Sequence, residues 1–149
     1  VRRLSFGAGD FSLDMNIRWT MQEHELDYAR AKIATASRAA RLESPLDTVF
    51  IHLGMLEGLR SSSERARNFG FQGKLCIHPE QIEPVNQVFS PSSEEIEQAQ
   101  KYVDAFTAAE ASGSASIQVE GYFIDYPIVE KARRTLDVAK AIEQSRRRV

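Results

Sequence analysis

The residues best placed to do chemistry stand near the start of the chain, where an apolar segment gives way to two glycines and a carboxylate. Gly7 and Gly9 carry no Cβ, so the backbone there can approach a small ligand closely. Asp10 follows directly and could hold a hard cation or a polar substrate. This order is typical of the C-terminal end of a buried parallel strand, where α/β folds bind ligands. The spacing alone favours a simpler alternative, an ordinary strand-to-helix turn with a helix-capping aspartate.

Three other polar side chains are weaker candidates. Asp125 stands just before Pro127, and by itself this spacing predicts a cap for the last helix. His78 ends a short apolar segment before Pro79, and it fits a hydrogen-bonded core histidine as well as a ligand contact. Lys74 could meet a phosphate group, or it could be a charge at the edge of a strand.

The first half of the chain alternates apolar segments with helical patterns. Apolar and small residues recur every three or four positions between 21 and 42, which predicts a helix, and Thr20 with Glu23 forms a plausible capping box. The order strand, helix, strand, helix, strand predicts a parallel sheet, because the connections are long enough to be helices. The other expected elements are a strand ending near Gly7, a strand over 46–53, a helix over 54–68 closed by Gly70, and a strand over 73–79.

The second half has a different character. Pro91, two serines and first-turn acids predict the start of a long helix, and the alternation around Glu120 and Gly121 predicts a β-hairpin. Three parallel strands leave both sheet edges bare, so 1–90 is expected to be half of a doubly wound sheet or of a (β/α)8 barrel. Residues 91–149 are expected to form a helix–hairpin–helix extension. Its elements, with the helix before it, are expected over 80–89, 93–111, 115–126 and 128–144.

The order of the elements predicts an α/β fold, and composition indicates a soluble globular chain of 149 residues, 42% hydrophobic and 27% charged. A net charge of −2 gives no electrostatic case for nucleic acid or an anionic membrane. Cys76 is the single cysteine, which excludes an internal disulfide framework, and we expect it to be a small buried apolar side chain. Cytoplasmic residence is the expected location. Because Val1 lies inside an apparent strand, the sequence is expected to be truncated at its N-terminus.

Several motifs occur together in an order that resembles one family. They are FGAGDFSLD, LEGL followed by FGFQGKLCIHPEQI, and EGYFIDYPIVEKA. In this order they resemble the aldolase/citrate lyase family, which includes citrate lyase β-subunits and malyl-CoA or citramalyl-CoA lyases. The resemblance implies the last strands of a (β/α)8 TIM barrel plus a C-terminal lid. It also implies Mg²⁺-dependent cleavage of a 3-hydroxyacyl-CoA or acyl-carrier thioester to acetyl-CoA and a keto acid, in a homotrimer or hexamer.

The resemblance also implies roles for individual residues. Asp10 matches the Mg²⁺-binding carboxylate, and the backbone of Gly7, Ala8 and Gly9 would lie against the substrate carboxylate. Asp125 matches an acid of the lid, which would protonate the acetyl enolate after closing over a neighbouring subunit. Lys74, His78 and Pro79 match a segment near the coenzyme A thioester.

Some features depart from the family pattern. Met55 and His52 stand where relatives often carry acidic or polar residues, and the chain has no counterpart of the family's catalytic arginine or second metal-binding glutamate. The chain alone is therefore expected to lack part of the active site. Two alternatives remain open: a non-catalytic CoA- or acyl-carrier-binding homologue or partner subunit, and another barrel enzyme such as a class II aldolase. The presence of both Asp10 and Asp125 favours a lyase.

Overall fold

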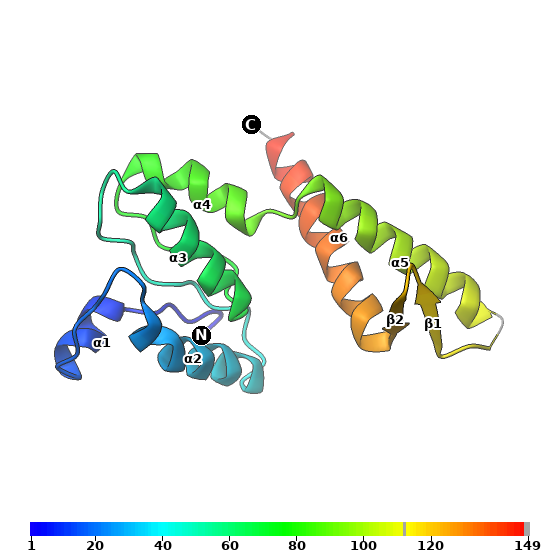
Figure 1. Cartoon of the computed structure of the whole chain (residues 1–149), viewed down its shortest axis with the longest axis horizontal. Helices are drawn as coiled ribbons and strands as arrows, with labels where there is room; N and C mark the ends of the chain where they lie inside the picture. The colour runs from blue at the N-terminus through cyan, green and yellow to red at the C-terminus, as the bar shows by residue number, and fades with distance from the viewer. Residues whose placement is uncertain (112, 148–149) are drawn as a thin grey trace. The chain divides into compact units, whose positions relative to one another are not determined.

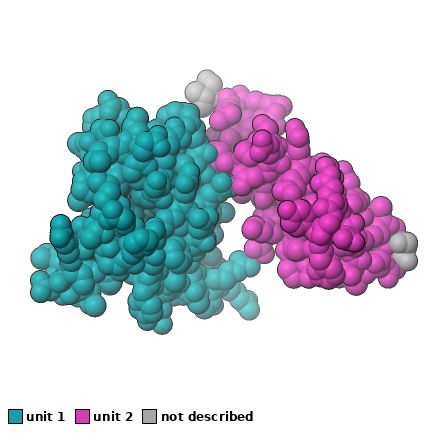
Figure 2. All heavy atoms as spheres, in the orientation of Figure 1, with its two compact units in different colours: residues 1–89 teal, residues 90–149 magenta. Residues whose placement is uncertain are grey.

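The chain divides into two compact units, residues 1–89 and 90–149 (Figure 2). A computed structural model describes residues 1–111 and 113–147. No helix within these ranges is long and apolar enough to cross a membrane.

Three extended segments of the first unit run parallel to one another. Leu46 N donates to Leu4 O, and Phe6 N donates to Leu46 O, which joins the first segment to the middle one. On the other side, Asp47 N donates to Gly73 O and Leu75 N donates to Asp47 O. The parallel order predicted from sequence is therefore correct in this unit.

The pairing is much shorter than the predicted strands over 46–53 and 73–79, which are wrong in length. It consists of the isolated bridges Ser5–Leu46 and Asp47–Lys74. Beyond Asp47, side chains replace backbone partners: Gln81 Nε2 donates to Phe50 O at 2.8 Å, and Gln81 Oε1 accepts from Ile77 N at 3.0 Å. A ladder cannot continue where its backbone groups are already bonded to side chains.

Helix α1 (Ala8–Asp14) follows the first extended segment directly, where the sequence patterns predict no helix before residue 21. Its N-cap, Gly7, has no side chain, so the usual sequence signal of a helix start is missing. The buried side chain of Ala8 and the ring of Phe6 pack with Leu26 of the next helical segment. This packing accounts for a short helix that composition alone does not reveal.

The next helix is shorter than the expected 21–42. A 3₁₀ turn, η1 (His24–Leu26), leads into α2 (Asp27–Ala39). Glu23 adopts a left-handed conformation with φ of 55° and is buried, so it cannot serve the predicted capping box. Thr20 instead donates from its amide and its hydroxyl to Glu25.

Two further helices complete the first unit, α3 (Leu56–Asn68) and α4 (Ile82–Phe89), which pack together through Phe50, Leu59 and Val85 (Figure 1). A 3₁₀ turn, η2 (Pro79–Gln81), precedes α4. Gly70, with φ of 92°, follows α3 as the sequence predicted, because few other residues adopt this conformation without strain.

The second unit matches its predicted elements. Helix α5 (Ser93–Ala111) packs along α6 (Tyr126–Arg146), and the strands β1 (Ser116–Val119) and β2 (Tyr122–Asp125) form an antiparallel hairpin (Figure 1). Glu120 and Gly121 both have positive φ, which is typical of a tight two-residue hairpin turn. Phe106, Ile124 and Val129 are buried where these elements meet.

Candidate functional site

Asp10 lies in the first turn of α1, four residues beyond Phe6, the last paired residue of the first extended segment. Its side chain is exposed. The carboxylate folds back toward Gly7: a Cβ added at Gly7 would lie 3.5 Å from Asp10 Oδ2. Asp10 therefore stands at the C-terminal end of a parallel segment, with its carboxylate open to a ligand.

The expected contact of Ala8 with a substrate does not fit this geometry. The side chain of Ala8 is fully buried, and its amide donates to Thr48 Oγ1 at 3.1 Å. An amide already bonded inside the protein cannot also bind a substrate carboxylate without losing that bond. Gly7 and Gly9 are both exposed and remain candidates.

The carboxylate of Asp10 is a suitable ligand for Mg²⁺. Mg²⁺ commonly takes one or two carboxylates and keeps water or substrate oxygens in its other positions. Among residues 1–111 and 113–147, no group of three or more histidine, cysteine, aspartate or glutamate side chains could hold a metal ion. Asp10 can thus serve as one ligand, with other positions of the ion left to water or substrate oxygens.

His78 and Pro79 lie together at the start of η2. The imidazole is half-buried, and its Nδ1 accepts from Glu80 N at 3.3 Å, so His78 caps this short turn. Pro79 is exposed at the first position of the turn.

Cys76 is exposed, whereas the sequence analysis expects a buried apolar side chain, so that expectation is wrong. Partial burial of the thiol raises the pKa of Cys76, although the charge of Lys74 acts in the opposite direction.

Lys74 does not occupy the position expected of a coenzyme A contact. Its side chain is completely buried, and Nζ lies 2.6 Å from Asp47 Oδ2. An ammonium held in this way is not presented to a phosphate group at the surface. The correction has a physical reason, because a buried lysine requires a paired carboxylate.

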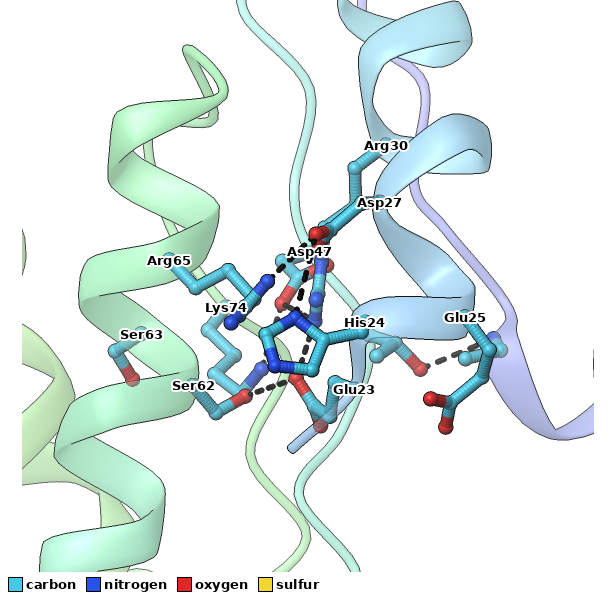
Figure 3. A network of polar contacts seen from close by, with 12 residues as sticks. Glu23, His24, Glu25, Asp27, Arg30, Asp47, Ser62, Ser63, Arg65 and Lys74 are labelled. Atoms are coloured by element: carbon cyan, nitrogen blue, oxygen red, sulfur yellow. Dashed lines mark hydrogen bonds and ion pairs between the residues drawn. The ribbon is translucent and has the colours of Figure 1, made fainter. Parts of the chain in front are cut away.

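Lys74 belongs to a buried network of four charged residues (Figure 3). Arg30 donates from Nε and Nη2 to the two carboxylate oxygens of Asp47, each at 3.0 Å. Arg30 Nη2 also lies 2.6 Å from Glu23 Oε2, which accepts in addition from the hydroxyl of Ser62 at 2.8 Å. Two acids and two bases thus balance one another and join η1, α2, α3 and two extended segments.

The network favours the charged form of its arginine. Burial by itself would lower the pKa of Arg30, but hydrogen bonds to Asp47 and the charges of Asp47 and Glu23 raise it above its ordinary value. Sequence analysis missed this cluster. Its signal was present: Arg30 lies one turn from Leu26 and next to Ala29 on a face that is otherwise apolar, where a charged residue needs a buried partner.

A cleft of about 650 Å³ opens beside the network. Glu23 and Ser62 contribute to its wall, and so do Asp27 and Arg65, whose carboxylate and guanidinium lie 2.6 Å apart. None of the candidate residues from the sequence lines this cleft. It is therefore separate from the position of Asp10.

Asp125 is the last residue of β2 and the N-cap of α6. Its Oδ1 accepts from Ile128 N at 3.4 Å, so the capping role expected from sequence is present. Side chains alternate along a strand, so Asp125 shares the outward face of the hairpin with the exposed Phe123, while Ile124 points into the core. Asp125 itself is half-buried.

The sequence of this chain is similar to a family model and to several known proteins. A family model described as HpcH/HpaI aldolase/citrate lyase matches residues 1–79. The citrate lyase subunit beta of Leuconostoc mesenteroides subsp. cremoris is 37% identical over 138 residues, which are 93% of this chain and 45% of that protein. A (3S)-malyl-CoA thioesterase of Cereibacter sphaeroides is 36% identical over 136 residues, 91% of this chain and 47% of that protein.

A solved structure is also similar. CitE from Mycobacterium tuberculosis, in complex with magnesium, acetoacetate and coenzyme A, has a TM-score of 0.74 and 26% identity, covering 91% of this chain and 51% of that one. The chain spans about half the length of the relatives it matches. The match of the family model and the extent of the sequence identity confirm the prediction made from the motifs: this chain belongs to the HpcH/HpaI aldolase/citrate lyase family.

Proposed function

We propose that this chain is part of a carbon–carbon lyase that cleaves a 3-hydroxyacyl thioester of the citryl, malyl or citramalyl type to acetyl thioester and a keto acid. The observation that carries the proposal is the position of Asp10, an exposed carboxylate at the C-terminal end of a parallel segment. In barrels and open α/β sheets, this is the end at which ligands bind. The similarity to citrate lyase subunit beta supports the same chemistry.

Asp10 is proposed as a ligand of Mg²⁺, and Gly7 and Gly9 as the backbone that lies against the substrate carboxylate. A bound Mg²⁺ would stabilise the negative charge on the hydroxyl-derived oxygen while the carbon–carbon bond breaks. The folded-back carboxylate of Asp10 lies beside Gly7, which brings the proposed metal ligand and the proposed substrate-binding backbone together. The complex of a structural relative with magnesium and coenzyme A supports this assignment.

Asp125 is proposed as the acid that completes the reaction. Bond cleavage leaves two electrons on the terminal carbon of the acetyl thioester as an enolate, and that carbon must take up a proton. A carboxyl group brought to it by a closing lid can give that proton while water is kept out. The exposed rings of Tyr122 and Phe123 beside Asp125 support a covering role for the hairpin. We propose that the second unit acts as this lid, over a neighbouring subunit of a trimer or hexamer.

His78 and Pro79 are proposed to lie near the coenzyme A thioester. The half-buried imidazole holds η2 by its Nδ1, which leaves Nε2 as the atom that could meet a ligand. Lys74 is not included in this proposal, because its ammonium group is buried in an ion pair with Asp47.

Thioester hydrolysis is the second candidate function, because one relative is a malyl-CoA thioesterase. The two reactions give different products. The full-length protein would be incubated with malyl-, citramalyl- and citryl-CoA and with citryl thioester on an acyl-carrier protein, with Mg²⁺ or with a chelator. A lyase releases acetyl thioester and keto acid in equal amounts, whereas a thioesterase releases a free thiol and the intact hydroxy acid. Lack of both product pairs in the presence of Mg²⁺ would contradict the proposed function.

A further inference from the structure

Helix α1 begins without a capping side chain of its own. Its N-cap is Gly7, which makes no side-chain hydrogen bond, and the first amide inside the helix belongs to Ala8. The first amides of a helix have no partner within it and must find one elsewhere. Ala8 is completely buried, so water is a poor substitute. Its partner is Thr48, whose Oγ1 accepts from Ala8 N at 3.1 Å.

The position of this bond is informative. Leu46 N donates to Leu4 O and Phe6 N donates to Leu46 O, so the pairing between the first and middle segments advances two residues at a time. The next amide of the first segment on this spacing is that of Ala8, and its opposite residue is Thr48. The bond is made, but the threonine hydroxyl takes the place of a backbone carbonyl. The chain can therefore leave the extended conformation at Ala8 without leaving that amide unpaired.

Thr48 is itself held firmly. It is 2% exposed and directly follows Asp47, which is fixed by Arg30 and Lys74 through side-chain bonds and by Gly73 and Leu75 through backbone bonds. Asp10 stands two residues after Ala8, in the same first turn. A displacement of Ala8 would consequently displace the carboxylate of Asp10 as well.

We propose that Thr48 is a positioning residue: its hydroxyl sets the start of α1 and thereby holds Asp10 in place for a divalent cation. The second part of this inference rests on the proposed role of Asp10 as a metal ligand. The buried network then contributes to the proposed metal site, because it anchors Asp47 and so holds the adjacent Thr48, which aligns the first turn of α1. Groups that orient a metal ligand commonly change metal affinity by about 10- to 100-fold when they are removed.

The test uses the full-length protein and two readouts. The dissociation constant of Mn²⁺ alone, measured by electron paramagnetic resonance, is expected to rise about tenfold in Thr48→Val, which keeps the shape and loses the hydroxyl. Thr48→Ser, which keeps the hydroxyl, is expected to bind Mn²⁺ nearly as the wild type does. Ser63→Ala is the matched control, because it removes another buried hydroxyl bond, from Ser63 to Leu59 O at 2.7 Å, away from α1.

Amide hydrogen exchange is the second readout and requires no metal. The Ala8 amide is expected to exchange slowly in the wild type and about tenfold faster in Thr48→Val, with smaller changes outside α1. If Thr48→Val does not fold, the wild-type exchange and the binding by Thr48→Ser still decide the matter: a rapidly exchanging Ala8 amide, or weak binding by the serine variant, would overturn the proposal.

The outcomes separate this inference from the function on which it rests. If Asp10→Asn loses Mn²⁺ binding while Thr48→Val binds normally, Asp10 keeps its role and the positioning role of Thr48 is wrong. If Asp10→Asn binds Mn²⁺ as the wild type does, the metal assignment of Asp10 falls. The exchange rate of Ala8 then decides alone whether Thr48 sets the start of α1.

Discussion

Arg30 donates hydrogen bonds from Nε and Nη2 to the two carboxylate oxygens of Asp47, each over 3.0 Å, and both side chains are completely buried. The bond joins α2 to the middle extended segment. Taking two charges out of water costs several kcal/mol per ion, and a paired geometry is needed to offset that cost. The pair therefore specifies how α2 packs, and the loss of Arg30 is costly because buried Glu23 loses this charged partner while Asp47 keeps only Lys74.

The first prediction concerns this pair. Arg30→Met is expected to lower the free energy of unfolding by about 3–5 kcal/mol, since Asp47 would keep only Lys74 as a charged partner. Urea titration followed by the fluorescence of Trp19, which packs against the core of the first unit, measures this change. Arg2→Met is the control: Arg2 pairs with Glu43 at the surface of the same unit, and the loss of an exposed pair is expected to change the free energy of unfolding little. Equal effects of the two substitutions would contradict the structural role of Arg30.

Sequence patterns predicted elements whose signals are local. Proline and acids at the start of α5, and Glu120–Gly121 in the hairpin, determine backbone geometry within a few residues, and both elements were predicted correctly. Long-range pairing has no such signal. The early end of the middle segment depends on Gln81, 31 residues away from Phe50, and the start of α1 depends on Thr48.

The same distinction applies to the site. The position of Asp10 at a segment end followed from the adjacent glycines, and the capping by Asp125 followed from Pro127. The burial of Lys74 could not be predicted in this way, because its partner Asp47 lies 27 residues earlier in the chain. A lysine near a strand end has the same local sequence whether it faces a phosphate or a buried carboxylate.

The second prediction concerns acid stability. Burial by itself would raise the pKa of Glu25, but hydrogen bonds from the amide and hydroxyl of Thr20 outweigh it and hold the pKa below its ordinary value of 4.5. The folded state thus favours the ionised form. The stabilisation is present above the ordinary pKa and is lost as the pH falls through the lowered one.

Unfolding of the wild type and of Glu25→Gln, compared between about pH 3 and 6, tests this linkage. The wild type is expected to be the more stable at the upper end, with a difference that shrinks as the pH falls. In a Thr20→Val background the pH dependence of this difference should be only somewhat weaker, because valine removes the hydroxyl donor but keeps the backbone amide, which lowers the pKa of Glu25 more than the hydroxyl does. A difference that grows on acidification would mean that the sign is wrong.

The third prediction concerns Cys76. Although Cys76 is an exposed residue, partial burial of its thiol raises the pKa, so less of the reactive thiolate is present at neutral pH than in an unstructured peptide. Alkylation by iodoacetamide is expected to be slow near pH 7 and to rise with a midpoint above that of the same thiol in the urea-unfolded chain. The rate of mass increase as a function of pH measures this midpoint. A folded-state midpoint below the unfolded one would show that the charge of Lys74 outweighs burial.

The last prediction separates the two roles of Asp125, as a helix cap and as a proposed acid. Asparagine caps helices about as well as aspartate does, whereas alanine costs about 0.5–2 kcal/mol at such a position. Asp125→Asn is therefore expected to keep the stability of the second unit and Asp125→Ala to lower it. If Asp125 also protonates the enolate, both variants should lose turnover by about 10²- to 10⁴-fold, mainly in kcat, since asparagine carries no acidic proton. Substrate cleavage by the full-length protein, with thermal unfolding in parallel, measures both effects.

Mixing Asp125→Asn with Asp10→Ala subunits extends the test, because lids that close over neighbours would restore some intact sites. Normal kcat in Asp125→Asn would leave the residue as a helix cap alone, and a mixture without activity after subunit exchange would argue against a site shared between subunits.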